Sequence, residues 1–233
     1  MTSIAMQFKD AAKARKKAIN KDRLAAEYEA DTIRQTAEDY DQYQLQLNSL
    51  EIDLKRLSGL SPGDKDRLKR DELIPKYYPQ AQDYMDQGDG YKNLILVEVV
   101  IMMLDVGQIP ESMNLALCAA EQKQPMPDRF KKTNLHTFIA DSVLNWANIQ
   151  IAKGQTHDPE FSEVFDIMRE DGWKVPRELI AKYHKLAGDV ELGNNEPEQA
   201  LDHFIKATEI DPVGAKCATK IKQIKKQLDT RGS

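Results

Sequence analysis

The apolar positions near the start of the chain repeat with the period of a helix. From Ala5 to Leu57 there is no proline and no glycine, and residues with high helix propensity dominate. Between Ile33 and Leu57, apolar side chains and one threonine recur at alternating steps of three and four residues. This is the a and d pattern of a heptad repeat, whose stripe needs a second helix to cover it. We predict a coiled-coil or oligomerisation helix at 24–57, with a seam made by Ile33, Tyr40, Tyr43, Leu47, Leu50, Leu54 and Leu57.

The heptad pattern leaves the partner of this helix open. The stripe can pair with further copies of the chain, in a coiled coil or a helical ring. It can equally pack on the C-terminal part of its own chain. The spacing also does not distinguish a parallel from an antiparallel pair.

A turn separates the heptad helix from the rest of the chain. The stretch "SGLSPGDKDR" (58–67) contains glycines, a proline and serines, so we predict a hinge at 58–66. Beyond it the alternating pattern of strands is nearly absent, and the expected helices span 66–73, 79–86, 91–106, 110–123, 134–153, 159–171, 176–192, 197–210 and 213–229. The predicted fold is all-α: a long N-terminal heptad-bearing helix, then a C-terminal domain of helical hairpins at 67–233.

One helical pair in this domain has tetratricopeptide-like spacing. In "KLAGDVELGNNEPEQALDHFIKATEIDP" (185–212), the residues at the positions typical of that repeat are Gly188, Ala200, Phe204, Ala207 and Pro212. Small residues let two antiparallel helices approach, and the aromatic ring fills the gap between them. The stretch 107–125 is a degenerate second copy, with Met113, Leu117, Ala120 and Pro125 at the matching positions. Because two copies do not support a solenoid, we expect helices around Trp146 and Phe161 to complete the core.

Positive charge is concentrated at the two ends of an acidic chain. The whole chain carries a net charge of −5, yet residues 1–23 and residues 216–233 each carry +5, so the middle carries −15. Basic ends on an acidic body are typical of a protein that binds a polyanion, although lysines can also merely solvate helix ends. We predict a DNA-binding arm at 1–23, formed by Lys9, Lys13, Arg15, Lys16, Lys17, Lys21 and Arg23. The basic C-terminal helix is predicted to bind a partner through Lys216, Lys220, Lys222, Lys225 and Lys226.

The sequence lacks the motifs of common catalytic and phosphate-binding sites. There is no G-x-x-x-x-G-K-[ST] loop, and no G-x-G-x-x-G follows a strand. The four histidines lie far apart in the sequence, at His136, His157, His184 and His203. Acidic residues cluster at 83–89 and 160–171, but with the spacing of solvated helix faces rather than of the carboxylate site that a metal-dependent nuclease needs. We therefore predict no catalytic residue, no metal site and no cofactor.

Apolar runs and cysteines place the chain in a reducing compartment. The longest apolar stretch, "LILVEVVIMML" (94–104), is too short for a membrane span, and Glu98 interrupts it. Cys118 and Cys217 fit no disulfide framework. We expect a cytoplasmic protein with no membrane partner.

Five short stretches resemble one protein family in the same order. They are "ELIPKYYP" (72–79), "MLDVGQI" (103–109), "QPMP" (124–127), "IAKYHKLAG" (180–188) and "ALDHFIKATEID" (200–211). From about Asp22 to Lys226 the chain resembles the small terminase subunit of tailed bacteriophages that package DNA through cohesive ends. Tyr77 stands where that family leads us to expect a tryptophan, and Asp71 interrupts the basic run 65–70.

The resemblance implies a DNA-packaging accessory in the cytoplasm of the host cell. Such a subunit binds the packaging site on double-stranded phage DNA as a homo-oligomer, for which a ring is one arrangement. It recruits the large subunit, which is the ATPase motor. The family is often labelled an endonuclease subunit. We interpret that label as describing the complex, with hydrolysis on the large subunit.

Two other functions compete with this interpretation. A helical adaptor or scaffold that binds only protein would carry its lysines for solubility alone. A metal-dependent endonuclease would use the acidic clusters directly. Whether the basic C-terminal helix binds DNA or the motor also stays open at this point.

Overall fold

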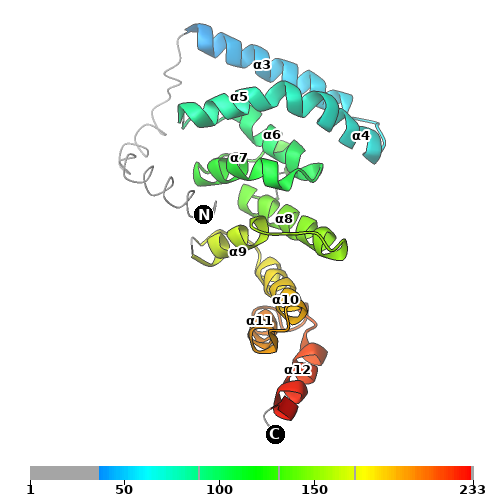
Figure 1. Cartoon of the computed structure of the whole chain (residues 1–233). Coiled ribbons are helices and arrows are strands. Elements are labelled where there is room, and N and C mark those ends of the chain that lie inside the picture. The colour runs from blue at the N-terminus through cyan, green and yellow to red at the C-terminus, as the bar shows by residue number, and fades with distance from the viewer. Residues whose placement is uncertain (1–36, 89, 131, 171, 232–233) are drawn as a thin grey trace, which may run out of the picture. The chain divides into compact units, whose positions relative to one another are not determined.

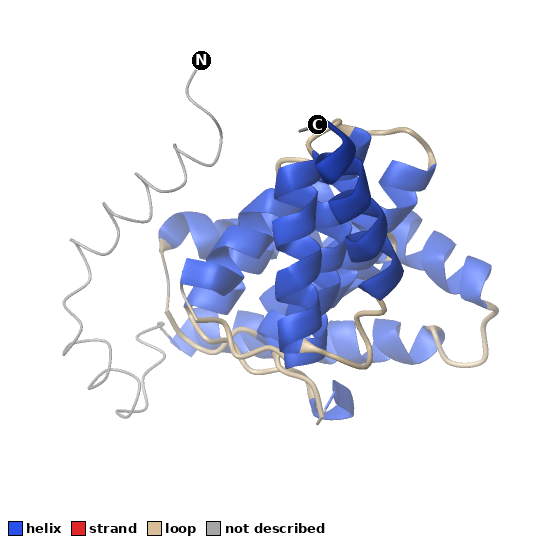
Figure 2. Ribbon diagram, turned by 90° about the horizontal axis from the view of Figure 1, so that it is seen from below, coloured by secondary structure: helices blue, strands red, loops and turns tan. Residues whose placement is uncertain are grey.

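The computed structural model describes residues 37–231 apart from 89, 131 and 171. The chain divides into two compact units, Met1–Leu135 and His136–Ser233. Every regular element in the described part is helical, and Figure 2 shows only helices and loops there. The all-α prediction is confirmed. The division at Leu135 falls inside the segment that the sequence predicted as a single domain at 67–233.

The elements follow one another as labelled in Figure 1. The first unit contains α3 (Ala37–Arg56), α4 (Pro62–Leu68), the π-helix η1 (Lys69–Leu73), α5 (Ile74–Gln87), α6 (Leu94–Asp105), α7 (Ile109–Glu121) and the short 3-10 helix η2 (Asp128–Phe130). The second unit contains α8 (Leu135–Ala152), which begins at the boundary, α9 (Glu160–Glu170), α10 (Arg177–Gly193), α11 (Pro197–Ile210) and α12 (Ala218–Arg231).

Helical structure begins inside the predicted hinge and continues across two prolines. Ser61 caps α4 by accepting a hydrogen bond from the N–H of Asp64, and Pro62 occupies the favoured first position of that helix. The chain then stays helical through η1 and α5. The wider π turn of η1 stands directly before Pro75, whose missing N–H would cost an α-helical hydrogen bond. The π turn thus explains why no gap separates the two helices predicted at 66–73 and 79–86.

Helix α6 is the centre of the first unit. Its residues 95–104 are all buried, and α3, α5 and α7 pack against it, as expected for a helix that is apolar all round. The side chain of Asn93 caps its start by accepting a hydrogen bond from the N–H of Leu96 at 3.0 Å. The N–H of Leu94 donates to the hydroxyl of Tyr43 in α3 at 3.1 Å. Two side chains therefore fix the start of α6.

Gln124, in the "QPMP" stretch, joins this helix start to the end of α5. Its side-chain oxygen accepts from the N–H of Asn93 at 2.9 Å, while its amide nitrogen donates to the Tyr84 hydroxyl at 2.9 Å and to the Tyr91 carbonyl at 2.8 Å. The side chain is buried. Because a buried amide is costly unless its donors and acceptors are paired, this network favours one arrangement of α5, α6 and α7.

The core between α8, α9 and α10 in the second unit is built around Tyr183. The Tyr183 hydroxyl donates to the carbonyl of Ala140 at 2.7 Å, and its ring stacks on Phe161 with the centroids 5.0 Å apart. Phe161 is buried in this core, as the sequence analysis predicted, whereas Trp146 is only half-buried. Trp173 stacks on His136 at 4.8 Å between centroids, which agrees with a packing role.

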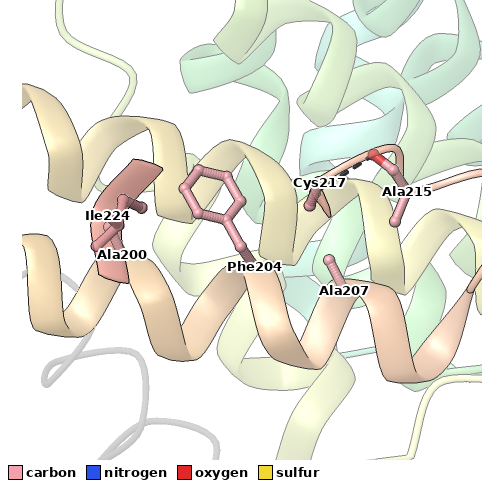
Figure 3. Packing of buried hydrophobic residues seen from close by; sticks show 6 residues of the cluster. All are labelled: Ala200, Phe204, Ala207, Ala215, Cys217 and Ile224. Atoms are coloured by element: carbon pink, nitrogen blue, oxygen red, sulfur yellow. Dashed lines mark hydrogen bonds between the residues drawn. The ribbon is translucent and has the colours of Figure 1, made fainter. Parts of the chain in front are cut away.

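Helices α10, α11 and α12 pack through small residues and one aromatic ring. Figure 3 shows the buried cluster made by Ala200, Phe204 and Ala207 of α11 with Ala215, Cys217 and Ile224. The Phe204 ring lies directly against Gly188 of α10. The packing reason given for the spacing therefore holds in this hairpin, while the tetratricopeptide assignment itself stays a prediction. In the proposed second copy, Met113, Leu117 and Ala120 of α7 are also buried.

Replacing Gly188 by alanine should destabilise the second unit. A Cβ atom at Gly188 would lie 2.9 Å from Cε1 of Phe204, closer than carbon atoms approach in folded proteins, so the buried ring would have to move. We expect a loss of about 1–3 kcal/mol in the free energy of unfolding, as for other overpacked cores. Chemical denaturation followed by circular dichroism measures it.

Gly193→Ala is the matched control, because Gly193 ends the same helix and a Cβ atom there meets nothing within 4 Å. This variant should be neutral or slightly stabilised. Equal losses in both variants would contradict the close contact between Gly188 and Phe204.

Candidate functional site

The predicted DNA-binding residues precede the described part of the chain. All seven lie outside the described residues: Lys9, Lys13, Arg15, Lys16, Lys17, Lys21 and Arg23. Ile33 of the predicted seam lies outside as well, and Tyr40 lies in α3 at a position where only the backbone is described. What the structure adds is the environment of the rest of the seam and of the basic C-terminal helix.

The seam on α3 faces helices of its own chain. Tyr43 and Leu50 are buried, and Leu47, Leu54 and Leu57 are half-buried. Tyr43 contacts α6 through the hydrogen bond described above and meets Tyr91 edge to face, with the ring centroids 5.9 Å apart. In the described part of α3, then, the stripe is largely covered by the same unit. Oligomerisation through this seam stays a prediction.

Asp53 anchors α3 to α5 beside this seam. Its carboxylate accepts hydrogen bonds from Lys76 at 2.7 Å and from the Tyr77 hydroxyl at 2.8 Å, and it pairs with Arg56 at 3.1 Å. Burial alone would raise the pKa of Asp53, but these hydrogen bonds outweigh it and lower the pKa below its usual value. Tyr77, the residue that departs from the family pattern, thus supplies a hydroxyl that donates a hydrogen bond to the buried carboxylate of Asp53.

The basic C-terminal helix presents lysines of two kinds. Lys220 is half-buried: it pairs with Asp189 of α10 and lies over the Phe204 ring, 5.2 Å from the centroid. The other predicted partner-binding lysines are exposed: Lys216, which precedes α12, and Lys222, Lys225 and Lys226 within it. Ile224 on the opposite face of α12 is buried against α11. Packing therefore holds α12 by one face and leaves a basic face in solvent.

The acidic clusters do not converge on a metal site in the described residues. No three His, Cys, Asp or Glu side chains there have the arrangement needed to hold an ion. Just before the second cluster, Asp158 accepts hydrogen bonds from Ser162 at the start of α9, and within the cluster Asp166 pairs with Arg169 at 3.6 Å. Burial raises the pKa of Glu163, and the nearby charge of Glu160 adds to this shift. Asp89 and Asp171, at the ends of the two clusters, lie outside the described residues.

Two histidines that are far apart in the sequence meet in the structure. Nδ1 of His184 on α10 and Nδ1 of His203 on α11 share a hydrogen bond of 3.0 Å, and the Phe165 ring contacts His184 edge to face. Burial lowers the pKa of His184 to about 4, and the neighbouring charges of His203, Lys206 and Arg169 act in the same direction. Burial also lowers the pKa of His203. Both imidazoles are therefore neutral at neutral pH and join the two helices as a polar packing contact.

Sequence reasoning missed two further features of the first unit. Glu98, inside the apolar stretch of α6, is only 1% exposed and accepts two hydrogen bonds from the guanidinium group of Arg129 in η2. These hydrogen bonds raise the pKa of Arg129. On α3, Leu45 and Ile52 are exposed large apolar residues outside the predicted seam. Two signals in the sequence could have indicated these features: the charged Glu98 within the apolar run 94–104, and the seven-residue spacing of Leu45 and Ile52.

None of the helices in the described part is long and apolar enough to span a membrane.

Comparison with known proteins identifies the relatives of this chain. The family model described as "Phage small terminase subunit" matches residues 44–178, more than half of the chain. A protein of Haemophilus phage HP1 (strain HP1c1), named "Probable terminase, endonuclease subunit", is 35% identical over 119 residues, which are 51% of this chain and 42% of that protein. The "Terminase, endonuclease subunit" of Escherichia phage P2 is 24% identical over 169 residues, which are 72% of this chain and 68% of that protein. No solved structure matches.

The matched region has clear limits. The family match covers α3 from Gln44 to the start of α10, and it includes neither the basic arm at 1–23 nor α12. The chain also spans less than half the length of the Haemophilus phage relative that it matches.

Proposed function

Because the chain belongs to the phage small terminase subunit family, we propose that it binds the packaging site on double-stranded phage DNA as an oligomer and recruits the large terminase subunit. Membership itself implies a role in DNA packaging. The observation that carries the proposal is the match of residues 44–178 to the family model. The DNA contact, the oligomer and the contact with the motor are the further steps proposed below.

The basic arm at 1–23 is the proposed DNA contact. Its net charge of +5 suits phosphate binding, and no base-reading pattern is evident in "KARKKAINKDR" (13–23). One arm with about five phosphate contacts would bind weakly and without sequence preference. Several arms held together through 24–57 would bind far more tightly, because each further contact becomes intramolecular. In this scheme sequence choice arises from arm spacing, from DNA bending or from the large subunit.

The exposed face of α12 is the proposed contact with the large subunit. Lys222, Lys225 and Lys226 are exposed while Ile224 is buried, so the basic face is held in a fixed orientation on the second unit. A preorganised row of ammonium groups is suited to an acidic patch on a protein partner. DNA is the other polyanion that this face would fit, and the triple lysine variant argued in the Discussion separates the two.

Cleavage of the cohesive ends is proposed to occur on the large subunit. The relatives are named endonuclease subunits, and that name fits a complex in which the small subunit positions the DNA. In the described part of the chain, Asp158 accepts a hydrogen bond from Ser162 just before the second acidic cluster, and Asp166 within the cluster pairs with Arg169 on the surface of α9. These are the contacts of a solvated helix, which supports a structural role for the second acidic cluster.

Titration of packaging-site duplex DNA with the full chain at several salt concentrations tests the proposal. Five phosphate contacts predict a slope of about −4.5 for the logarithm of the binding constant against the logarithm of salt concentration, which is roughly a 500-fold loss between 50 and 200 mM. Several arms acting together would steepen the slope.

Absence of DNA binding at low salt would favour a protein-only adaptor. The same mixtures with Mg²⁺ should leave the DNA intact. Cleavage that disappears when one carboxylate is changed would place the nuclease on this chain.

A further inference from the structure

The outer face of α3 carries two exposed apolar side chains that its own unit does not cover. Leu45 is 70% exposed and Ile52 is 64% exposed, and seven residues separate them, so they lie on the same face of the helix. Tyr43 and Leu50, on the opposite face, are buried within the unit. Because Tyr43 and Leu50 already pack within the unit, the outer side of α3 is where a second helix would meet apolar side chains that are still exposed.

The charges on this outer face have a self-complementary arrangement. The exposed acidic residue Asp41 precedes Leu45 by one turn, and the exposed basic residue Lys55 follows Ile52 by one turn. Along α3 the order is acidic, apolar, apolar, basic. A second copy that runs antiparallel presents the reverse order, so that each acidic residue faces a basic residue and each apolar residue faces an apolar one. An isologous contact requires such a pattern, because each residue must meet its complement on an identical surface.

We propose that two copies of the chain pair antiparallel through this outer face of α3. Leu45 of each copy lies against Ile52 of the other, and Asp41 of each copy lies near Lys55 of the other. The two-fold axis passes close to Asn48. This inference rests on the proposed assembly of the chain and specifies which face and which orientation it uses. A parallel, in-register pair would instead place Asp41 beside Asp41 and Lys55 beside Lys55, and like charges in such positions repel.

The antiparallel pair has a consequence for DNA binding. With a rise of 1.5 Å per residue, the two copies of Ala37, where α3 begins, lie about 34 Å apart along the pair. One turn of B-DNA is about 34 Å, the spacing of half-sites read by two-fold symmetric proteins. The two basic arms precede α3 by the 13 residues at 24–36, so the points from which the chain leads to the arms lie about one DNA turn apart. The pair therefore favours two half-sites related by a two-fold axis.

Site-specific cysteine cross-linking of the full chain tests the orientation. In an antiparallel pair, Asn48→Cys meets its own copy across the axis, whereas the copies of Asp41→Cys lie about 20 Å apart, far beyond disulfide reach. Glu51→Cys, exposed on the side of α3, is the matched control. The native thiols of Cys118 and Cys217 are buried and give little background. We expect roughly tenfold more disulfide-linked dimer for Asn48→Cys than for either other variant under mild oxidation.

Each other outcome overturns the inference. Cross-linking of Asp41→Cys as well as Asn48→Cys means a parallel pair. No cross-linking of Asn48→Cys, together with an unchanged mass of the Leu45→Asp, Ile52→Asp double variant in light scattering, means that something other than a second copy covers this face. DNA binding measured on the same proteins keeps the two questions apart. If DNA binds but Asn48→Cys does not cross-link, the proposed function is supported and the antiparallel pair is wrong. If Asn48→Cys cross-links but DNA does not bind, the pair is supported and the proposed DNA binding is wrong.

Discussion

Deletion of residues 1–23 should weaken binding to duplex DNA at least about 100-fold at 50 mM salt, because it removes about five phosphate contacts and their released counterions. The deleted segment carries seven Lys or Arg residues and two Asp residues. The salt dependence should flatten together with the affinity, since both arise from the same ion release. The oligomer mass should stay unchanged, because α3 and its packing on α5 and α6 lie outside the deletion. Fluorescence anisotropy with a labelled duplex, combined with light scattering, measures both quantities.

The basic face of α12 provides the matched control for this deletion. Replacing Lys222, Lys225 and Lys226 by glutamine removes positive charge from the other basic end without touching the buried face of the helix. If α12 meets the large subunit, this triple variant should bind DNA as the unaltered chain does and should lose binding to the large subunit. A truncated protein that keeps its full DNA affinity would reduce the arm to a solvated helix end. A triple variant that loses DNA affinity instead would move the DNA contact to α12.

Helical periodicity predicted the class of the fold and most of its elements, and it failed where local chemistry decides. The predicted hinge at 58–66 holds the start of α4, because Ser61 caps a helix whose first residue is Pro62. A glycine and a proline indicate a break in general, but a proline directly after a capping serine begins a helix. The gap expected between the helices predicted at 66–73 and 79–86 is likewise helical: Pro75 lies in the first turn of α5 directly after the π turn of η1, and Pro79 lies inside α5.

The heptad pattern identified which face of α3 is buried but not what buries it. Tyr43 and Leu50 were assigned to a seam whose partner was left open between other copies and the chain's own helices, and they pack on helices of their own unit. An apolar stripe carries the same signal in both cases, because burial against any apolar surface selects the same spacing. The outer pair, Leu45 and Ile52, was overlooked because two apolar residues among polar ones resemble ordinary surface variation.

Pairs of polar residues distant in the sequence were the least predictable part of the molecule. His184 and His203 meet only because α10 and α11 form a hairpin with Gly188 at its close contact. The Glu98–Arg129 pair depends on η2 returning to the middle of α6. Spacing along one helix reports neighbours three and four residues away, so contacts across 19 or 31 residues leave no periodic trace.

Replacing Arg129 by methionine should lower the free energy of unfolding by about 3 kcal/mol, because it leaves the carboxylate of Glu98 buried without its partner. Glu98 is only 1% exposed and lies in the most apolar helix of the first unit. For a chain of this size the loss corresponds to a fall of roughly 6–12 °C in Tm. Arg67→Met is the matched control: its partner Asp64 is half exposed, so its loss should cost less than about 1 kcal/mol.

The double variant Glu98→Leu with Arg129→Met decides how the pair acts. If the cost of the single variant comes from an uncompensated buried charge, removing both charges should restore stability to within about 1 kcal/mol of the unaltered chain, or exceed it. If the double variant is as unstable as Arg129→Met, the arginine contributes mainly through its packing on Phe130, where it lies 4.8 Å from the ring centroid. Recovery in the double variant would mean that the Glu98–Arg129 pair is not needed for stability. If Arg129→Met is as stable as Arg67→Met, the carboxylate of Glu98 is solvated once its partner is removed.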